Sequence, residues 1–340
     1  MTLSKTRRND EGAALITVLG LLVVFMMLGT AWVGYMMVEH QETDWNVNGL
    51  HATHAAQGGI NAGIAAVQSA IAEGTSPKLN DRIELEIPVY RENTADTGVP
   101  AASDRRVCRV SVRLMDEAAR VNINHAPPNV LREILQVDGE KARQIRSSLP
   151  RTEEAAGEGD EVRRWFSSVD ELVTRGFLAP EALSEDMAGM LTVYTVPDPA
   201  NAHGYMNVNT APARVLQALL NITPETATQV ANARPFGDVT ELSAAAGKDP
   251  AAFNVRPAPD ALNTLPPELS FSSRCYRILS TAELVDTQAA DASVPVATVT
   301  IEAVACVDDQ GNTRIMYWNE SAGRDSAEPS EEPEPEAPAA

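Results

Sequence analysis

The chain has 340 residues and a formal net charge of -20, with 47 acidic and 27 basic side chains. This length is enough for one long or two ordinary domains with a substantial core. Hydrophobic residues make up 44% of the chain, which excludes disorder throughout. Because so acidic a surface repels phosphate backbones, a nucleic-acid-binding function would require a local basic patch.

Residues 13–38 form an uncharged, mostly apolar segment of 26 residues. As a helix it would be about 39 Å long, so we expect it to span a bilayer. A secretory signal has a shorter apolar core and a small-residue cleavage site, and neither description fits. Lys5, Arg7 and Arg8 precede the span, so the positive-inside rule predicts a cytoplasmic N-terminus and a large part on the other side of the membrane.

The start of this segment is more specific than its length. A short basic leader, residues 1–12, ends in Gly12 and is followed at once by AALITVLGLLVVF. This resembles a prepilin leader, and the resemblance implies that a prepilin peptidase cuts between Gly12 and Ala13. Pilin-like subunits usually carry Glu at the fifth mature position, where this chain has Thr17. Lacking that Glu is typical of the K-type minor pseudopilins (GspK) of type II secretion systems. An ordinary single-pass anchor is the alternative.

Beyond the span, apolar residues continue at helical spacing and predict that the helix runs to about residue 73. These positions are Ile60, Ile64, Val67 and Ile71. We expect the glycine pair at residues 58–59 to kink or loosen the helix, and Gly74 to end it.

Alternating apolar and polar residues predict strands on both sides of a long central segment. The predicted strands are 82–90, 106–114, 274–284, 295–307 and 312–318. The sheet is therefore expected to combine both ends of the chain, in an α+β fold with a pilin-like long N-terminal helix. Residues 116–267 are predicted to be a large inserted all-α domain.

The insertion contains an internal repeat at a spacing of 85 residues. RVNINHAPPNVLREIL ends at Leu135 and aligns with YMNVNTAPARVLQALL, which ends at Leu220. FSSVDEL later matches FGDVTEL at a spacing of 70, so the first copy carries extra residues. The two copies span about 116–172 and 201–242.

Each copy begins with the same short polar motif, which we expect to start a helix. Asn124 and Asn209 are expected to cap it, and Pro127 and Pro212 to lie in its first turn, while Asn122 and Asn207 precede them. The arrangement resembles tandem helix-hairpin-helix (SAM-like) units of competence DNA receptors and equally the helical domain of K-type pseudopilins.

The turns between the paired helices distinguish these two resemblances. DNA-binding versions present bare backbone N–H groups to a phosphate, usually beside Lys or Arg. Here the turns are VDGE, with Glu140, and ITPE, with Pro224 and Glu225. We therefore expect no nucleic-acid partner and interpret the repeat as a packing or protein-contact module.

The resemblance to K-type pseudopilins covers nearly the whole chain, except for an acidic tail at residues 320–340. It implies a subunit that initiates or caps the tip of a periplasmic pseudopilus. It also implies a single-pass inner-membrane protein with its bulk in the periplasm. The implied partners are the I- and J-type minor pseudopilins, the major pseudopilin, the inner-membrane secretion platform and the prepilin peptidase. A membrane-anchored DNA receptor and a minor pilin of a type IV pilus are the alternatives.

These inferences divide the chain into six parts. They are a leader (1–12), a transmembrane helix (13–38), two portions of a pilin-like domain (39–115 and 268–319), the inserted helical domain (116–267) and a disordered tail (320–340).

Catalytic motifs are not evident in the sequence, so we do not expect an enzyme. His51 and His54 could share a metal, but a solvated helix face is the simpler interpretation. The family resemblance implies calcium in the helical domain, and hard cations prefer clustered oxygens. The candidate ligands form an acidic segment, for which a solvated loop is the alternative: Glu153, Glu154, Glu158, Asp160 and Glu161. A second cluster, Asp116 and Glu117 with Asn122 and Asn124, is better explained by capping.

Three cysteines are compatible with an oxidising exterior. If the strands around Cys275 and Cys306 form a hairpin centred near residue 290, the two residues lie opposite each other and a disulfide is expected. Cys108 is the rival partner or a free thiol, and three small buried residues are the alternative.

Overall fold

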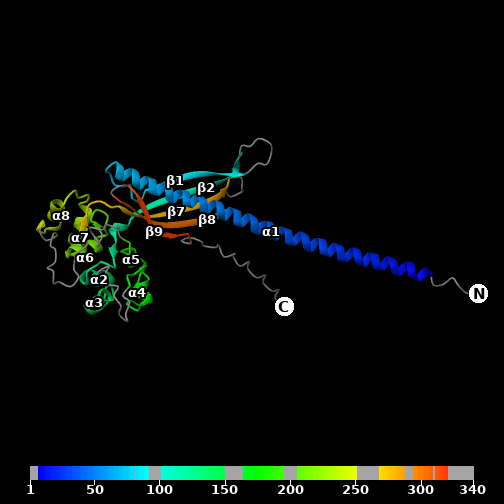
Figure 1. Cartoon of the computed structure of the whole chain (residues 1–340), viewed down its shortest axis with the longest axis horizontal. Coiled ribbons are helices and arrows are strands. Elements are labelled where there is room, and N and C mark those ends of the chain that lie inside the picture. Colours follow the sequence, from blue (N-terminus) through cyan, green and yellow to red (C-terminus); the bar gives the residue numbers. More distant parts are fainter. Residues whose placement is uncertain are drawn as a thin grey trace, which may run out of the picture.

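The computed structural model describes residues 7–79, 81–91, 101–149, 164–194, 205–250, 268–287, 294–308 and 311–320. The fold is α+β, with a long N-terminal helix, an antiparallel sheet and a group of short helices at one end (Figure 1). This confirms the predicted fold class in its main features.

Five antiparallel strands form the main sheet in the order β1-β2-β7-β8-β9. They are β1 (Arg82–Arg91), β2 (Ala101–Asp116), β7 (Cys275–Asp286), β8 (Ala297–Val307) and β9 (Thr313–Asn319). β2 pairs with β7, so strands from the two ends of the chain meet at the centre of the sheet. The alternation of apolar residues in β1, β2, β7 and β8 places one face of these four strands against the N-terminal helix.

Helix α1 (Arg7–Ala72) is continuous, and its C-terminal part covers one face of the sheet. The prediction that residues 58–59 kink or loosen the helix is wrong. A Cβ atom at Gly59 would lie 2.7 Å from Val110 Cγ1, and one at Gly63 would lie 2.7 Å from Ile278 Cγ2. The glycines are therefore positions at which helix and sheet approach closely.

Helix α1 ends at the predicted glycine. Gly74 has a φ of +67°, and its N–H donates to Ile71 O at 3.0 Å. The N–H of Thr75 donates to Ala70 O at 2.8 Å. This left-handed termination satisfies two of the last carbonyls of the helix.

The helices of the insertion are short and lie between β2 and β7 along the chain. The elements are η1 (Glu117–Ala119), β3 (Val121–Asn122), α2 (Pro128–Leu135), α3 (Gly139–Ser147), α4 (Glu171–Thr174), η3 (Pro180–Ala182), α5 (Glu185–Gly189), β4 (Leu191–Thr192), β5 (Tyr205–Asn207), α6 (Ala213–Leu220), α7 (Pro224–Asn232), α8 (Val239–Ala246) and β6 (Glu268–Ser270). They enclose a hydrophobic core that is separate from the core between α1 and the sheet.

The insertion lies at the end of the sheet that is farthest from the apolar part of α1 (Figure 1). Near the start of β2, Arg106 Nη1 donates to Asn48 Oδ1 at 2.6 Å. Near its end, Leu114 contacts the position of Gly63. The Asp116 end of β2 therefore lies beside the part of α1 that is farther from residues 13–38.

Candidate functional site

The apolar part of α1 has no packing partner within the described part of the chain. All side chains from Leu15 to Val38 are exposed, and α1 is the one described helix that is long and apolar enough to cross a membrane. Gly12 and Ala13 lie within the helical backbone of α1, and Thr17 lies one turn farther along. This region can act as a membrane anchor.

The two copies of the repeat place their helices at equivalent positions. Helix α2 begins and ends 85 residues before α6, and helix α3 begins and ends 85 residues before α7. The first helix of each pair ends in a left-handed residue, Gln136 or Asn221. Asp138 Oδ1 accepts from Lys141 N, and Thr223 Oγ1 accepts from Thr226 N. The N-termini of the second helices are thus capped by their own side chains.

The repeated asparagines do not cap helices, so that prediction is wrong. The N-cap residues of α2 and α6 are Pro127 and Pro212. Asn124 instead donates from Nδ2 to Phe166 O at 2.9 Å and accepts from Phe166 N at 2.8 Å. Asn209 makes the same pair of bonds to Phe236, at 2.9 and 2.8 Å. Each asparagine therefore fixes a distant loop to the start of its repeat.

The other repeated asparagines differ in their partners. Asn122 and Asn207 both accept, through Oδ1, from the backbone N–H two residues later. The Nδ2 of Asn207 donates to Asp116 Oδ2 at 2.8 Å, whereas the buried Nδ2 of Asn122 has no hydrogen-bond partner among the described residues. The second copy is therefore tied to the end of β2 through a bond that has no counterpart in the described part of the first copy.

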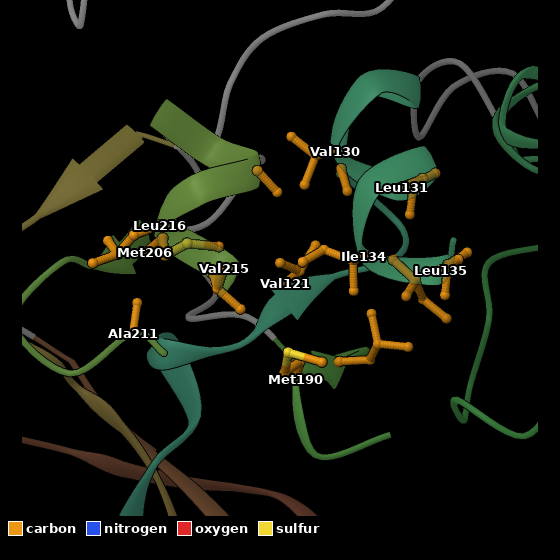
Figure 2. Packing of buried hydrophobic residues seen from close by; sticks show 14 of the residues in the cluster. Val121, Val130, Leu131, Ile134, Leu135, Met190, Met206, Ala211, Val215 and Leu216 are labelled. Carbon is orange, nitrogen blue, oxygen red and sulfur yellow. The ribbon is translucent and has the colours of Figure 1, made fainter. Parts of the chain in front are cut away.

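The two copies share one core and contact each other directly. Figure 2 shows side chains from both copies, including Ile134 and Val215, in one buried cluster. Arg214 Nη2 donates to Ile134 O at 3.2 Å, and Gln217 Nε2 donates to Glu133 Oε1 at 3.1 Å. The insertion is thus a single packed unit rather than two separate ones.

In each copy, a short strand near its start pairs in parallel with a short strand near its end. β3 pairs with β4 in the first copy, and β5 pairs with β6 in the second. The predicted bounds of the copies, at residues 172 and 242, leave out β4 and β6. Strands of two or three residues carry no alternation that a sequence could reveal.

A buried acidic pair joins the insertion to the sheet at the end of β2. Asp116 is 6% exposed and Glu117 is 1% exposed. Asp116 Oδ2 accepts from Asn207 Nδ2 and, at 2.5 Å, from Thr210 Oγ1. Its other oxygen accepts from Ala118 N, as the predicted capping role requires. Asp116 therefore attaches the second copy to the end of β2.

Glu117 connects the first copy to the sheet through hydrogen bonds. Its Oε1 accepts from Thr192 Oγ1 at 2.5 Å and from Arg277 Nη2 at 2.8 Å, and its Oε2 accepts from Arg277 Nε at 2.8 Å. Arg277 also forms an ion pair with Glu302 on β8. We call Asp116, Glu117 and Arg277 the junction network.

The two acids of the junction network have opposite pKa shifts. Burial raises the pKa of Asp116 above its ordinary value, and the hydrogen bonds from Ser273, Thr210 and Asn207 only partly offset this. Burial also acts to raise the pKa of Glu117, but the hydrogen bonds and charge of Arg277 outweigh it, so the pKa is lowered. Glu117 is therefore held as a carboxylate.

Asp116 and Glu117 stand out in the sequence as an acidic pair, whereas Arg277, Thr192 and Thr210 do not. Arg277 is 160 residues from Glu117 along the chain. A basic residue on the polar side of a predicted strand gives no signal that it is an ion-pair partner. This part of the site is created by the topology of the sheet.

The remaining predicted site residues are an acidic segment and the cysteines. The acidic segment Glu153, Glu154, Glu158, Asp160 and Glu161 lies outside the described residues. Among the residues that are described, no group of three or more His, Cys, Asp or Glu side chains could hold a metal ion. Cys275 and Cys306 lie opposite each other on β7 and β8 and form a disulfide, while Cys108 is a buried free thiol.

The disulfide lies close to the junction network. Cys275 is two residues before Arg277, and it packs in a small cluster with Cys306, Val304 and Tyr194. The Tyr194 ring, just beyond β4, packs against that of Tyr317 at a tilt of 39°, with a centroid distance of 5.5 Å. This cluster is a second contact between the first copy and the sheet.

Part of the sequence matches the model of a known protein family. Residues 206–259 match the family model described as type II secretion system (T2SS), protein K. The match begins in β5 and includes the second copy of the repeat. No curated protein sequence matches the chain.

Among solved structures, the chain is similar to one chain of the GspK-GspI-GspJ complex from the type 2 secretion system of enterotoxigenic Escherichia coli. The identity is 11% and the TM-score is 0.49, over 83% of this chain and 99% of that chain.

Proposed function

We propose that this chain, a K-type minor pseudopilin of the type II secretion system, initiates or caps the tip of a periplasmic pseudopilus. The family match of residues 206–259 confirms the resemblance drawn from the sequence. The proposed tip position goes beyond this family match. It is supported by the position of the insertion in the fold.

The main support for this proposal is the position of the insertion. The insertion enters and leaves the sheet at one end, because Asp116 on β2 pairs with Tyr276 on β7. That end is the one farthest from the apolar part of α1. A subunit anchored through residues 13–38 would therefore carry the insertion above its sheet, where another subunit would otherwise stack.

The insertion is suited to this role because buried hydrogen bonds attach it to the sheet. Both copies contact the sheet through buried hydrogen bonds, to Asp116 in one case and to Glu117 in the other. We propose that the two copies are duplicated helix-hairpin-helix-like units that serve as a protein-contact module. Their identical helix spacing supports this interpretation.

We further propose the membrane arrangement implied by the leader. A prepilin peptidase would cut between Gly12 and Ala13, leaving a single-pass inner-membrane protein with its bulk in the periplasm. The partners would be the I- and J-type minor pseudopilins, the major pseudopilin and the inner-membrane platform. The Lys and Arg residues of the leader support a cytoplasmic N-terminus.

Two measurements test the proposal. The mass of the membrane-extracted chain should correspond to an N-terminus at Ala13, and a Gly12→Leu variant should keep its full length. A wild-type chain that begins at Met1 would contradict the pseudopilin assignment. Cross-linking from cysteines introduced at the exposed positions Arg132 and Arg143 should capture secretion partners and no subunit of the filament shaft. Cross-links to the major pseudopilin along the shaft would contradict the tip position.

The DNA-receptor alternative is tested separately with the same protein. It requires bare N–H groups at the turns before α3 and α7, where Asp138 and Thr223 already accept the backbone bonds. It also places a phosphate beside the exposed carboxylates of Glu140 and Glu225. We expect no salt-sensitive binding of a labelled DNA duplex by the full chain.

A further inference from the structure

The end of the sheet nearest to the apolar part of α1 carries exposed apolar side chains. Val294 and Val296, just before β8, are 61% and 41% exposed. Val296 N donates to Leu284 O at 2.7 Å, and Leu284 pairs with Cys108 of β2. The Sγ of Cys108 lies 3.9 Å from His51 O of α1. The two valines therefore lie where α1 first meets the sheet, and we call this the proximal end of the sheet.

Trp45 lies on the side of α1 that faces the sheet, but before the sheet begins. It precedes Ala52 and Ala56 by 7 and 11 residues, a spacing that keeps residues on one face of a helix, and both alanines are buried against the sheet. Asn48 is also buried and bonds to Arg106 near the start of β2. Trp45, three residues earlier, is 70% exposed. A large aromatic side chain is therefore left uncovered beside the proximal end of the sheet.

The length of the apolar part of α1 favours a tilted helix. Residues 13–38 measure about 39 Å as a helix, whereas the hydrocarbon core of a bilayer is about 30 Å thick. A span that is longer than the core tilts, and tryptophans at the interface help to set the direction. Trp45 lies about 10 Å beyond Val38 along the helix. A tilt toward the sheet brings Trp45 and the proximal end to the headgroups, whereas the opposite tilt lifts both away.

The charges beside Trp45 indicate which membrane surface fits. Residues 39–44 include Glu39, Glu42 and Asp44 and contain no Lys or Arg. Anionic headgroups repel carboxylates and attract basic segments. The surface that suits this part of α1 is therefore a zwitterionic one.

We propose that Trp45, Val294 and Val296 form a membrane-contact site that holds the proximal end of the sheet against zwitterionic headgroups. Trp45 places its ring at the interface, the two valines contact the same surface, and α1 tilts toward its sheet. The bilayer is the occupant because the site is continuous with the helix that is anchored in it. The inference rests on the proposed membrane anchor, but on neither leader cleavage nor the tip position.

Quenching of tryptophan fluorescence by brominated lipids tests the proposal with the full chain. Three of the four tryptophans are exposed, namely Trp32, Trp45 and Trp318. Each of three variants keeps one of them and has phenylalanine at the other two, and Trp165 is kept throughout because it packs against the core of the insertion. A fourth variant keeps Trp165 alone and gives the background.

Each variant is reconstituted in phosphatidylcholine vesicles, with or without bromines near the headgroup end of the acyl chains. We expect bromine to lower the fluorescence of the Trp45 variant by about a third or more, because the ring lies at the interface. The Trp318 variant should match the Trp165 background. A Trp45 variant that also matches the background would overturn the proposal.

Trp32 distinguishes failure of the membrane anchor from failure of this site. It lies within residues 13–38, so it should be quenched in any chain whose apolar part is inserted. Quenching of Trp32 without quenching of Trp45 would overturn the site and leave the anchor in place. Quenching of neither would contradict the anchor and the site together.

Serine substitutions test the part played by the sheet. Val294→Ser combined with Val296→Ser should reduce the quenching of Trp45 by about half, because apolar contact with the membrane surface is lost. Ile315→Ser is the matched control, since Ile315 is 48% exposed and pairs with Ala305, which lies opposite Tyr276 at the other end of the sheet. It should leave the quenching unchanged. Full quenching in the double-serine variant would overturn the proposed site, and quenching that depends on the protein-to-lipid ratio would assign Trp45 to a contact between chains instead.

Discussion

Glu117 shows how a buried charge is retained at the residue scale. Removing a carboxylate from water costs several kcal/mol, and at Glu117 this cost is offset by a two-point contact with Arg277 and a hydrogen bond from Thr192. Arg277 is in turn shared with Glu302. A buried pair of this kind is expected to contribute more to the orientation of the insertion than to net stability.

Glu117→Gln should therefore lower the free energy of unfolding by about 3 kcal/mol near neutral pH, because Arg277 loses its main partner while it remains mostly buried. Urea unfolding of the solubilised chain, followed by circular dichroism, measures this. Glu86→Gln is the matched control, since Glu86 pairs with Arg109 at the surface and its side chain is 73% exposed. Its effect should remain below about 1 kcal/mol.

The difference between wild type and Glu117→Gln should also depend on pH. The pKa of Glu117 is lowered in the folded chain. Its contribution to stability is thus fully present above its ordinary pKa of 4.5 and is lost as the pH falls through the lower, folded-state value. The raised pKa of Asp116 acts in the opposite sense, but both proteins share that contribution. A difference that grows as the pH is lowered below 4 would contradict the assigned sign.

Asn209→Ala tests the repeated asparagine. The side chain of Asn209 bonds to both backbone groups of Phe236 and also to Phe271 O, at 2.9 Å. Its loss leaves partly buried backbone groups unsatisfied, so we expect a destabilisation of about 2 kcal/mol or more in the same urea experiment. Asn232→Ala, at the exposed end of α7, should have an effect below about 0.5 kcal/mol. Similar effects of the two substitutions would argue against the role of Asn209.

At the scale of elements, contact between α1 and the sheet depends on glycine rather than on apolar area alone. Gly59→Ala would place a Cβ atom 2.1 Å from Ser280 Oγ and 2.7 Å from Val110 Cγ1. Among the described residues, nothing lies within 4 Å of a Cβ atom placed at Gly49. Alanine favours a helix over glycine by about 1 kcal/mol, so the two substitutions are expected to have opposite signs.

We therefore expect Gly59→Ala to lower the melting temperature and Gly49→Ala to leave it unchanged or raise it. Differential scanning calorimetry of the solubilised chain measures both. A stabilising Gly59→Ala would show that helix and sheet can move apart at little cost.

Elements with a strong period were predictable from sequence, and interactions between distant elements were not. Alternation located all five strands of the main sheet, and four of them, β1, β2, β7 and β8, have one face in the core against α1. The glycine pair at residues 58–59 was misinterpreted, since its role depends on strands more than 50 residues away. Asn124 and Asn209 precede helices and look like caps, yet they bond to Phe166 and Phe236. Local propensity cannot reveal a partner that only the tertiary fold provides.

At the scale of the whole molecule, the insertion should be removable without loss of the sheet. Because Asp116 lies opposite Tyr276, replacing residues 117–273 by Asn-Gly leaves four residues between this pair, namely Asn-Gly, Arg274 and Cys275. We expect this variant to retain its strand content and the disulfide between Cys275 and Cys306, but to abolish secretion. Circular dichroism, thiol titration and a secretion assay measure these outcomes. Normal secretion by the folded variant would contradict the proposed role of the insertion.

The pairing of β2 with β7 also determines the order in which the protein can fold. At roughly 5–20 residues per second, about 10 to 30 seconds of synthesis separate these two strands. During that interval α1, β1 and β2 have only part of their sheet, and the inner edge of β2 is open. The insertion, whose core lies between the two strands in sequence, can complete its own packing first. Residues 275–319 then close the sheet as the last step, so a chain interrupted within the insertion would leave the edge of β2 exposed to aggregation.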